Sequence, residues 1–372
     1  MPISLRLLPV VLSMLVLGAP MVADAAQKKP EVKLAHLAVL VDDVEKTSKF
    51  LTEVVGWRRH PLRFGTGSPT ADSKGQSHID ANGLWLELVS PTTAGPARDA
   101  LREKGNGAYG GLIFQSKNYT SMLDKMRTEG IALQSTDGGP LDTTSGRINQ
   151  WLKIDGRDEF RELRVAYWPK AVTRGTAVEM FEYRADHPDD VFTTRDRMWQ
   201  AAAVTPTGPR VDRIAIIVRD IEKTARFYTR VLGLRRHPET FKLDAGSNHR
   251  SGGMRVSFID AGGVWLALVQ PVGPGPLMEY LERKGDGFVA ELIVEVDDLA
   301  AYYDQMKAMG IQMVDTSGNP LDDREKAHVL VPFGDRIAYF PTDVSQGMVI
   351  EVSQRGPRET SLIHRRDRGW TR

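Results

Sequence analysis

The sequence has 372 residues, which is enough for two or three domains of ordinary size. Lysine and arginine total 49 and aspartate and glutamate total 48, so the formal net charge of +1 argues against a strongly basic nucleic-acid binder. Apolar residues make up 41% and charged residues 26%, which excludes wholesale disorder, and the absence of cysteine excludes disulfides, thiolate metal sites and cysteine nucleophiles.

The first 25 residues predict a secretory signal. Arg6 supplies a positive end, residues 7–17 are apolar apart from Ser13, and residues 23–25 (ADA) form a small-x-small cleavage site. The apolar run is shorter than the roughly 20 residues that a membrane-spanning helix needs. We therefore exclude residues 1–25 from the fold. We expect a mature protein in the periplasm or outside the cell, with no stable membrane span.

The rest of the chain repeats itself. Residues 34–61 align with 211–238, with 14 of 28 positions identical, and residues 79–91 align with 259–271, with nine of 13 identical. Residues 166–169 then match 338–341, so the first copy carries extra residues between 142 and 165. This tandem duplication predicts a first domain over 31–185, a proline-containing linker over 186–210 and a second domain over 211–355.

Each copy contains two similar modules. Four times, an apolar strand is followed by an acidic or polar turn, a helix of about 12 residues and a glycine, at Gly56, Gly130, Gly233 and Gly310. Two or three short strands follow each helix. We therefore expect an α+β protein of four β-α-β-β-β modules, paired into two domains of curved mixed sheets with helices on their outer faces. Residues 356–372 are rich in arginine, and we expect them to be a solvated tail.

Residues 35–57 (AHLAVLVDDVEKTSKFLTEVVGW) and 84–91 (LWLELVSP) resemble the vicinal-oxygen-chelate superfamily, which includes glyoxalase I, methylmalonyl-CoA epimerase and the extradiol dioxygenases. Residues 284–298 and 337–354 look most like the epimerase and glyoxalase branches. The resemblance covers nearly all of the mature chain. It implies the fold described above, but the superfamily contains isomerases, lyases, oxygenases and metal-free binding proteins.

In such families a divalent metal is held by one residue at the start of each module's first strand and one near the end of its sheet. The matching positions, in chain order, are His36 and Glu87, Gly111 and Glu179, Arg213 and Ala267, and Glu291 and Glu351. Glycine and alanine have no ligating atom in the side chain, and arginine keeps its proton. The resemblance thus implies Fe, Mn, Ni, Co or Zn held by a histidine and carboxylates, with Glu351 or Glu179 also able to move a proton.

Two arrangements of this site are open. If each domain builds its own site, the first domain has His36, Glu87 and Glu179. If the first module pairs with the fourth, as in the swapped arrangement of glyoxalase I, the ligands are His36 and Glu87 with Glu291 and Glu351. We expect the crossed arrangement, because the positions that lack a ligating side chain (Gly111, Arg213 and Ala267) then all belong to the second site, formed by modules two and three. The intradomain arrangement is the alternative, and His36 and Glu87 belong to both.

Other candidates have a plainer explanation. His78 replaces Phe258 of the second copy and could act as an acid or base, but we expect a surface histidine. The repeated Arg-Arg-His-Pro segments, which contain His60 and His237, suggest an anion site, yet their identical place after a helix favours a role in the turn.

The leading hypothesis is an exported, metal-dependent enzyme that isomerises, cleaves or dioxygenates a small molecule with adjacent oxygens. Export argues against substrates linked to CoA or glutathione. The alternative is a metal-free protein that binds or sequesters a small molecule, as drug-resistance members of the superfamily do. A four-module chain can close its own pseudo-dimer, which is compatible with a monomer and leaves the oligomeric state open.

Overall fold

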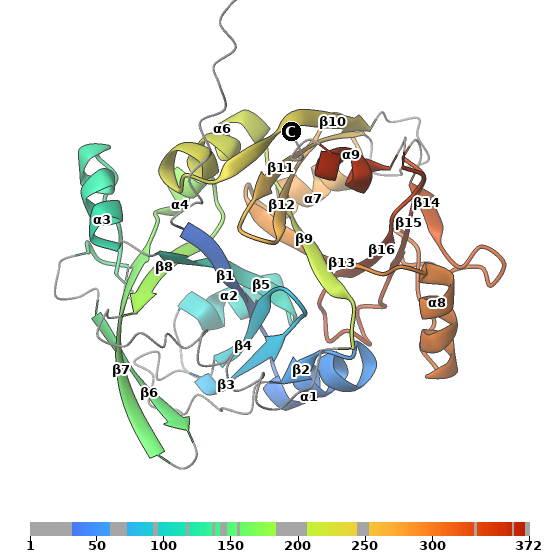
Figure 1. The fold of residues 1–372 in the computed structure, drawn as a ribbon, viewed down its shortest axis with the longest axis horizontal. Helices are drawn as coiled ribbons and strands as arrows, with labels where there is room; N and C mark the ends of the chain where they lie inside the picture. Colours follow the sequence, from blue (N-terminus) through green and yellow to red (C-terminus); the bar gives the residue numbers. More distant parts are fainter. Residues whose placement is uncertain are drawn as a thin grey trace, which may run out of the picture.

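The computed structural model describes residues 32–59, 73–91, 96–116, 119–135, 138–141, 147–154, 157–183, 207–243, 253–330, 333–358 and 361–368. It contains two eight-stranded sheets that lie side by side (Figure 1). The predicted signal sequence, His60 and most of the predicted linker lie outside the described residues.

The first sheet has the strand order β2-β3-β4-β1-β5-β8-β7-β6. Its strands are β1 (Val32–Leu40), β2 (Arg58–Arg59), β3 (Ser73–Asp80), β4 (Trp85–Pro91), β5 (Ala108–Ser116), β6 (Arg147–Ile154), β7 (Arg157–Tyr167) and β8 (Val178–Tyr183). The helices of this domain are α1 (Val44–Lys49), the π-helix η1 (Phe50–Val54), α2 (Pro96–Lys104), α3 (Tyr119–Thr128) and α4 (Lys170–Thr173).

The second sheet repeats this order as β10-β11-β12-β9-β13-β16-β15-β14. Its strands are β9 (Arg210–Ile217), β10 (Arg235–Leu243), β11 (Met254–Asp260), β12 (Trp265–Pro271), β13 (Phe288–Glu295), β14 (His328–Leu330), β15 (Asp335–Tyr339) and β16 (Ile350–Gln354). The helices are α6 (Ile221–Arg226), the π-helix η2 (Phe227–Val231), α7 (Pro276–Lys284), α8 (Leu299–Ala308) and α9 (Leu362–Arg368).

The tandem α+β fold is confirmed, and so is the prediction that a glycine follows the helix of each module. Gly56, Gly130, Gly233 and Gly310 all have positive φ, between 68° and 85°, where a residue with a Cβ is strained. The extra length of the first copy falls largely in the β6–β7 hairpin, whose strands of 8 and 11 residues replace strands of 3 and 5 residues in the second copy.

The two modules of each domain join through their first strands. Strand β1 pairs antiparallel with β5, and β9 pairs antiparallel with β13. Each sheet is therefore built from modules adjacent in the sequence, and the crossed arrangement that we expected is wrong. All four modules have the same local pattern, so the local sequence does not determine whether module one pairs with module two or with module four.

The helices cover the outer faces of the sheets and also join the domains. Thr47 of α1 and Leu51 of η1 are buried against the sheet side of this helical segment. Phe50 at the start of η1 meets Phe340 of the second domain with ring centroids 5.5 Å apart, and Trp168 of the first domain meets Phe227 of η2 at 5.9 Å. One continuous core thus runs from the outer face of one sheet to that of the other.

The repeated arginine pairs lie in strands β2 and β10 and make the same ion pairs in both copies. Arg58 contacts Asp80 and Arg235 contacts Asp260 in the same way, at 3.1 and 3.0 Å. In the second copy the buried His237 accepts a hydrogen bond from the Glu239 amide at its Nδ1.

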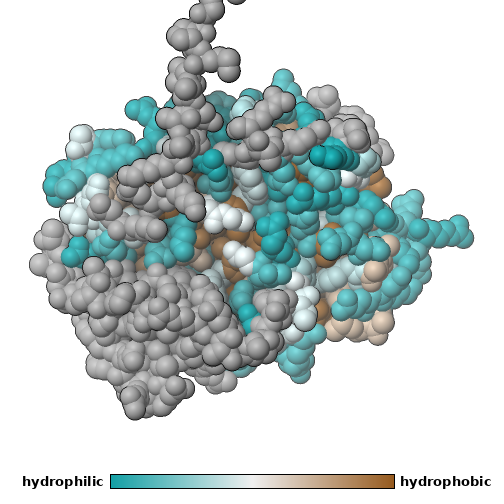
Figure 2. Space-filling view, in the orientation of Figure 1, coloured by the Kyte–Doolittle hydropathy of each residue, from teal (hydrophilic) through white to brown (hydrophobic). Residues whose placement is uncertain are grey.

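The coloured surface in Figure 2 is mostly hydrophilic, and hydrophobic residues show only in small areas. Within the part of the chain that the structure describes, no helix is both long and apolar enough to cross a membrane.

Candidate functional site

The register of the first sheet brings the predicted first-domain residues to one face. His36 of β1 lies opposite Ile113 of β5, which lies opposite Glu179 of β8. Glu87 of β4 lies opposite Ala38, two residues along β1 from His36. Because side chains alternate along a strand, His36, Glu87 and Glu179 all project from the face opposite the helices. We call this the inner face of the first domain.

His36 and Glu87 are in direct contact on the inner face. His36 Nε2 lies 3.1 Å from Glu87 Oε2, and the histidine is buried. The contact gives the half-buried Glu87 carboxylate a polar partner on this face. Their counterparts Arg213 and Ala267 show that the fold does not depend on either residue.

Glu179 adds a second carboxylate to this face. Burial, and after it the negative charge of Glu87, raise the pKa of Glu179, while a hydrogen bond from the Tyr167 hydroxyl lowers it; together they bring it to about 8. A carboxyl with this pKa can hold and release a proton near neutral pH. Tyr167 was not singled out by sequence as a site residue, although it recurs as Tyr339 in the repeated Ala-Tyr-aromatic-Pro segment.

His78 also belongs to the inner face, so our expectation of a surface histidine is wrong. It is buried and lies opposite Glu87 in the β3–β4 register. Its ring centroid is 5.9 Å from that of His36, in an edge-to-face arrangement. Strand alternation could have indicated this. His78 is two residues from Asp80 and so projects from the same face of β3, and Asp80 lies opposite Trp85 of β4.

Apolar side chains surround these polar groups. Ile113, Val165 and Phe181 are buried, and Trp85 and Tyr167 pack against them. The Phe181 ring lies 5.8 Å from the His36 ring. This surrounding lowers the local dielectric, which strengthens the interactions among the carboxylates and the histidine.

The donor chemistry of the inner face suits a divalent metal. An imidazole and a carboxylate 3.1 Å apart are spaced as two neighbouring ligand atoms around an ion with bonds of about 2.1 Å. As the side chains stand, however, no group of three or more His, Asp or Glu side chains among the described residues is placed to hold a metal ion. A third bond from Glu179 requires its carboxylate to turn from Tyr167 toward the pair.

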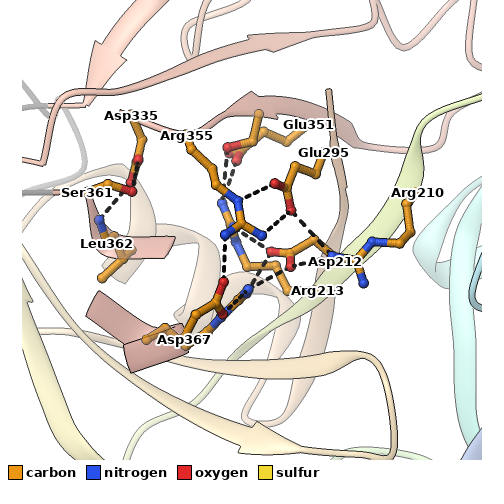
Figure 3. A network of polar contacts seen from close by, with 12 residues as sticks. Arg210, Asp212, Arg213, Glu295, Asp335, Glu351, Arg355, Ser361, Leu362 and Asp367 are labelled. Atoms are coloured by element: carbon orange, nitrogen blue, oxygen red, sulfur yellow. Dashed lines mark hydrogen bonds and ion pairs between the residues drawn. The ribbon is translucent and has the colours of Figure 1, made fainter. Parts of the chain in front are cut away.

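The same positions in the second domain form a different site. Arg213 replaces His36, and its guanidinium donates to Glu351 Oε1 at 3.3 Å and to Asp212 Oδ2 at 2.7 Å (Figure 3). The Tyr339 hydroxyl donates to Glu351 Oε2 at 2.6 Å. Burial and the negative charge of Glu351 raise the pKa of Glu291, and Arg213 and Tyr339 lower it, for a net value of about 8.

Glu291 and Glu351 were predicted as metal ligands, and Glu351 also as a proton-transfer residue. The structure places both on the second sheet around Arg213 and not beside His36. A guanidinium now supplies the positive charge at the position where the first domain has its histidine. The predicted site residues thus fall into two groups: His36, Glu87 and Glu179 lie on the first sheet, and Glu291 and Glu351 lie on the second.

Comparisons with known proteins agree with this architecture. The family model described as Glyoxalase/Bleomycin resistance protein/Dioxygenase superfamily matches residues 210–339. The ethylmalonyl-CoA/methylmalonyl-CoA epimerase of Cereibacter sphaeroides is 30% identical over 112 residues, which cover 30% of this chain and 78% of the epimerase. Human mitochondrial methylmalonyl-CoA epimerase is 29% identical over 104 residues, which cover 28% of this chain and 55% of that enzyme.

Among solved structures, a triple mutant of 4-hydroxymandelate synthase from Streptomyces coelicolor is similar over 91% of this chain and 98% of its own length. The TM-score is 0.58 and the sequence identity is 16%, so the likeness is one of fold.

Proposed function

The chain belongs to the glyoxalase, bleomycin-resistance protein and dioxygenase superfamily, and from this premise we propose that it is a divalent-metal-dependent enzyme with its site on the inner face of the first domain. The observation that carries the proposal is the contact between His36 and Glu87, with Glu179 on the same face. In the second domain an arginine occupies the equivalent of the histidine position, which makes that domain unsuited to a metal.

His36 and Glu87 would hold the metal, and Glu179 would complete the set. A histidine with carboxylates suits Fe, Mn, Co, Ni or Zn. When bound, such an ion polarises a carbonyl or a pair of adjacent oxygens in a small molecule.

The remaining chemistry falls to the side chains of this chain. When Glu179 is hydrogen-bonded to the Tyr167 hydroxyl and not bound to the metal, its carboxyl would take up and return a proton. Trp85, Ile113 and Phe181 exclude water and orient the apolar part of the substrate. We therefore favour proton transfer beside a carbonyl, as in an isomerase or lyase, over oxygenation. If residues 1–25 direct export, a substrate linked to CoA is disfavoured, in contrast to the named substrates of the epimerase relatives.

Elemental analysis of the full chain, purified without an affinity tag, tests the proposal. We expect about one equivalent of a transition metal in the wild type, strongly reduced in His36→Ala and in Glu87→Gln. Glu351→Gln is the control, since it removes the second domain's counterpart of Glu179 and is expected to keep the metal. Retention of metal by His36→Ala would contradict the proposal.

A second outcome would favour a different function. The apolar and aromatic side chains around the inner face also suit a protein that binds a small molecule without a metal. Wild-type protein that contains no metal, yet binds a small aromatic ligand through Trp85 and Phe181, would identify the chain as a sequestering protein.

A further inference from the structure

The C-terminal segment is not a solvated tail, contrary to our expectation. Residues 361–368 place α9 on the inner face of the second domain, the face that corresponds to the candidate site of the first (Figure 1). Leu362 and Ile363 are buried, and Leu362 packs in a cluster with Phe258, Ala267 and Ile293.

Arg366 of α9 is the most deeply placed charged residue of this segment. Its side chain is only 1% exposed. Nη1 donates to Asp212 Oδ2 at 2.7 Å and Nη2 donates to Asp212 Oδ1 at 2.8 Å, so the pair is bidentate. The guanidinium carbon also lies 5.0 Å from the Trp265 ring centroid and 5.8 Å from that of Phe258.

These partners satisfy the specific requirements of a guanidinium. A carboxylate accepts two parallel hydrogen bonds from the planar guanidinium, and aromatic faces attract the positive charge of the guanidinium. An ammonium group cannot form the same fork. Burial alone would raise the pKa of Asp212, but Arg213 and Arg366 lower it to about 2, so the carboxylate stays ionised.

Arg366 lies where a ligand bound to the corresponding face of the first domain would lie. Trp265 and Phe258 occupy the places that Trp85 and His78 occupy in the first domain. Arg366 therefore lies over the part of the second sheet that corresponds to the His36–Glu87 site.

We propose that the inner face of the second domain is a guanidinium-binding site and that Arg366 of the chain's own C-terminal helix is its resident ligand. The class of ligand is a guanidinium cation such as an arginine side chain. The proposal is independent of the metal site, because none of its residues lies in the first domain.

The helix is held at its start by polar contacts that do not involve Asp212. Buried Asp335 accepts hydrogen bonds from the Ser361 hydroxyl at 2.6 Å and the Leu362 amide at 3.0 Å (Figure 3). It also accepts one from the Gly356 amide at 2.7 Å. The attachment of α9 and the recognition of the guanidinium can therefore be altered separately.

Arg366→Ala in the full chain tests the site directly, with Arg365→Ala as the matched control. Arg365 is the preceding residue of the same helix, but its side chain is 40% exposed and pairs with Glu239. In Arg366→Ala, Asp212 keeps Arg213 as a partner, so the variant is expected to fold with Tm lowered by about 6 °C or more.

Methylguanidinium should then restore part of the lost Tm, while methylammonium at the same concentration should not. At ten times its Kd the expected gain is about 3 °C or more, seen in Arg366→Ala and absent from the wild type and Arg365→Ala. Equal effects of the two cations, or no effect of methylguanidinium in Arg366→Ala, would overturn the proposal.

If Arg366→Ala does not fold, Asp335→Asn replaces it, because that variant loosens α9 without changing the guanidinium partners. An acetylated peptide of residues 361–368 should bind Asp335→Asn, measured by fluorescence anisotropy. The same peptide with alanine in place of Arg366 should bind at least tenfold more weakly, and equal binding of the two peptides would refute the site.

Discussion

Replacing Glu179 by glutamine should change how the stability of the protein depends on pH. The folded protein raises the pKa of this carboxyl to about 8 from an ordinary value of 4.5. Between these values the folded state holds a proton that the unfolded chain has released. The contribution of the protonated carboxyl to stability is therefore complete below about pH 4.5 and is lost as the pH rises to about 8.

The size of this loss follows from the same two values. At 1.36 kcal/mol per pH unit, the difference between 4.5 and about 8 corresponds to roughly 5 kcal/mol. Glu179 is partly exposed, so screening reduces the figure, and we expect about 2 to 3 kcal/mol. Glu179→Gln cannot ionise but keeps a hydrogen-bond acceptor for Tyr167. It should match the wild type at pH 4.5 and exceed its stability by about 2 to 3 kcal/mol at pH 8.5.

Urea unfolding at a series of pH values, with a chelator present to remove any metal, measures this difference. Two further variants test the cause. Glu87→Gln removes the neighbouring negative charge and should move the transition of Glu179 to lower pH, whereas Tyr167→Phe removes the hydrogen bond and should move it to higher pH. Parallel stability curves for Glu179→Gln and the wild type between pH 4.5 and 8.5 would refute the reasoning.

Three other outcomes are expected. Gly175→Ala should destabilise the protein by about 3 kcal/mol or more in urea unfolding, because a Cβ at φ +95° would lie 1.7 Å from the Asp286 carbonyl oxygen. Gly130→Ala is the control: its φ is +68° but the space around it is open, so it should lose only about 1 kcal/mol. Trp57→Phe should cost about 1 to 2 kcal/mol in the same assay, since it removes the buried bond from Trp57 Nε1 to the Pro209 carbonyl, and a smaller change would show that this contact is dispensable. N-terminal sequencing of exported protein should return a start near Ala26, and a start at Met1 would contradict a cleaved signal.

Local features of the fold could be predicted from the sequence. Apolar periodicity and the four glycines marked the modules, because both depend on residues close together in the chain. The antiparallel pairing of β1 with β5 could not be predicted, since each module's first strand offers the same edge to any other module. His36, Glu87 and Glu179 were identified through the family resemblance, and the sheet register then separated them from Glu291 and Glu351.

The burial of Arg366 could not be predicted for a different reason. Its neighbours Arg365 and Arg368 give the segment the composition of a solvated tail, and the partner Asp212 lies 154 residues away. His78 was misassigned because a single histidine carries no periodic signal, and its burial depends on a partner strand.

The contact between the domains is reciprocal. A Cβ on Gly107 would lie 2.3 Å from the Met348 amide nitrogen, and a Cβ on Gly287, the equivalent glycine of the second copy, would lie 2.2 Å from the Arg174 carbonyl oxygen. Each domain thus inserts the same turn into the other, as two identical subunits would around a twofold axis.

In a dimer of identical subunits every substitution appears twice, so a mutation that removes a ligand removes it from both sites. Once the two halves are encoded in one chain, that constraint is lifted. One half can exchange a histidine for Arg213 and a glutamate for Ala267 while the other keeps both. The reciprocal turns keep the two halves in contact although their sequences differ, so the half with Arg213 and Ala267 still packs against the half with His36 and Glu87.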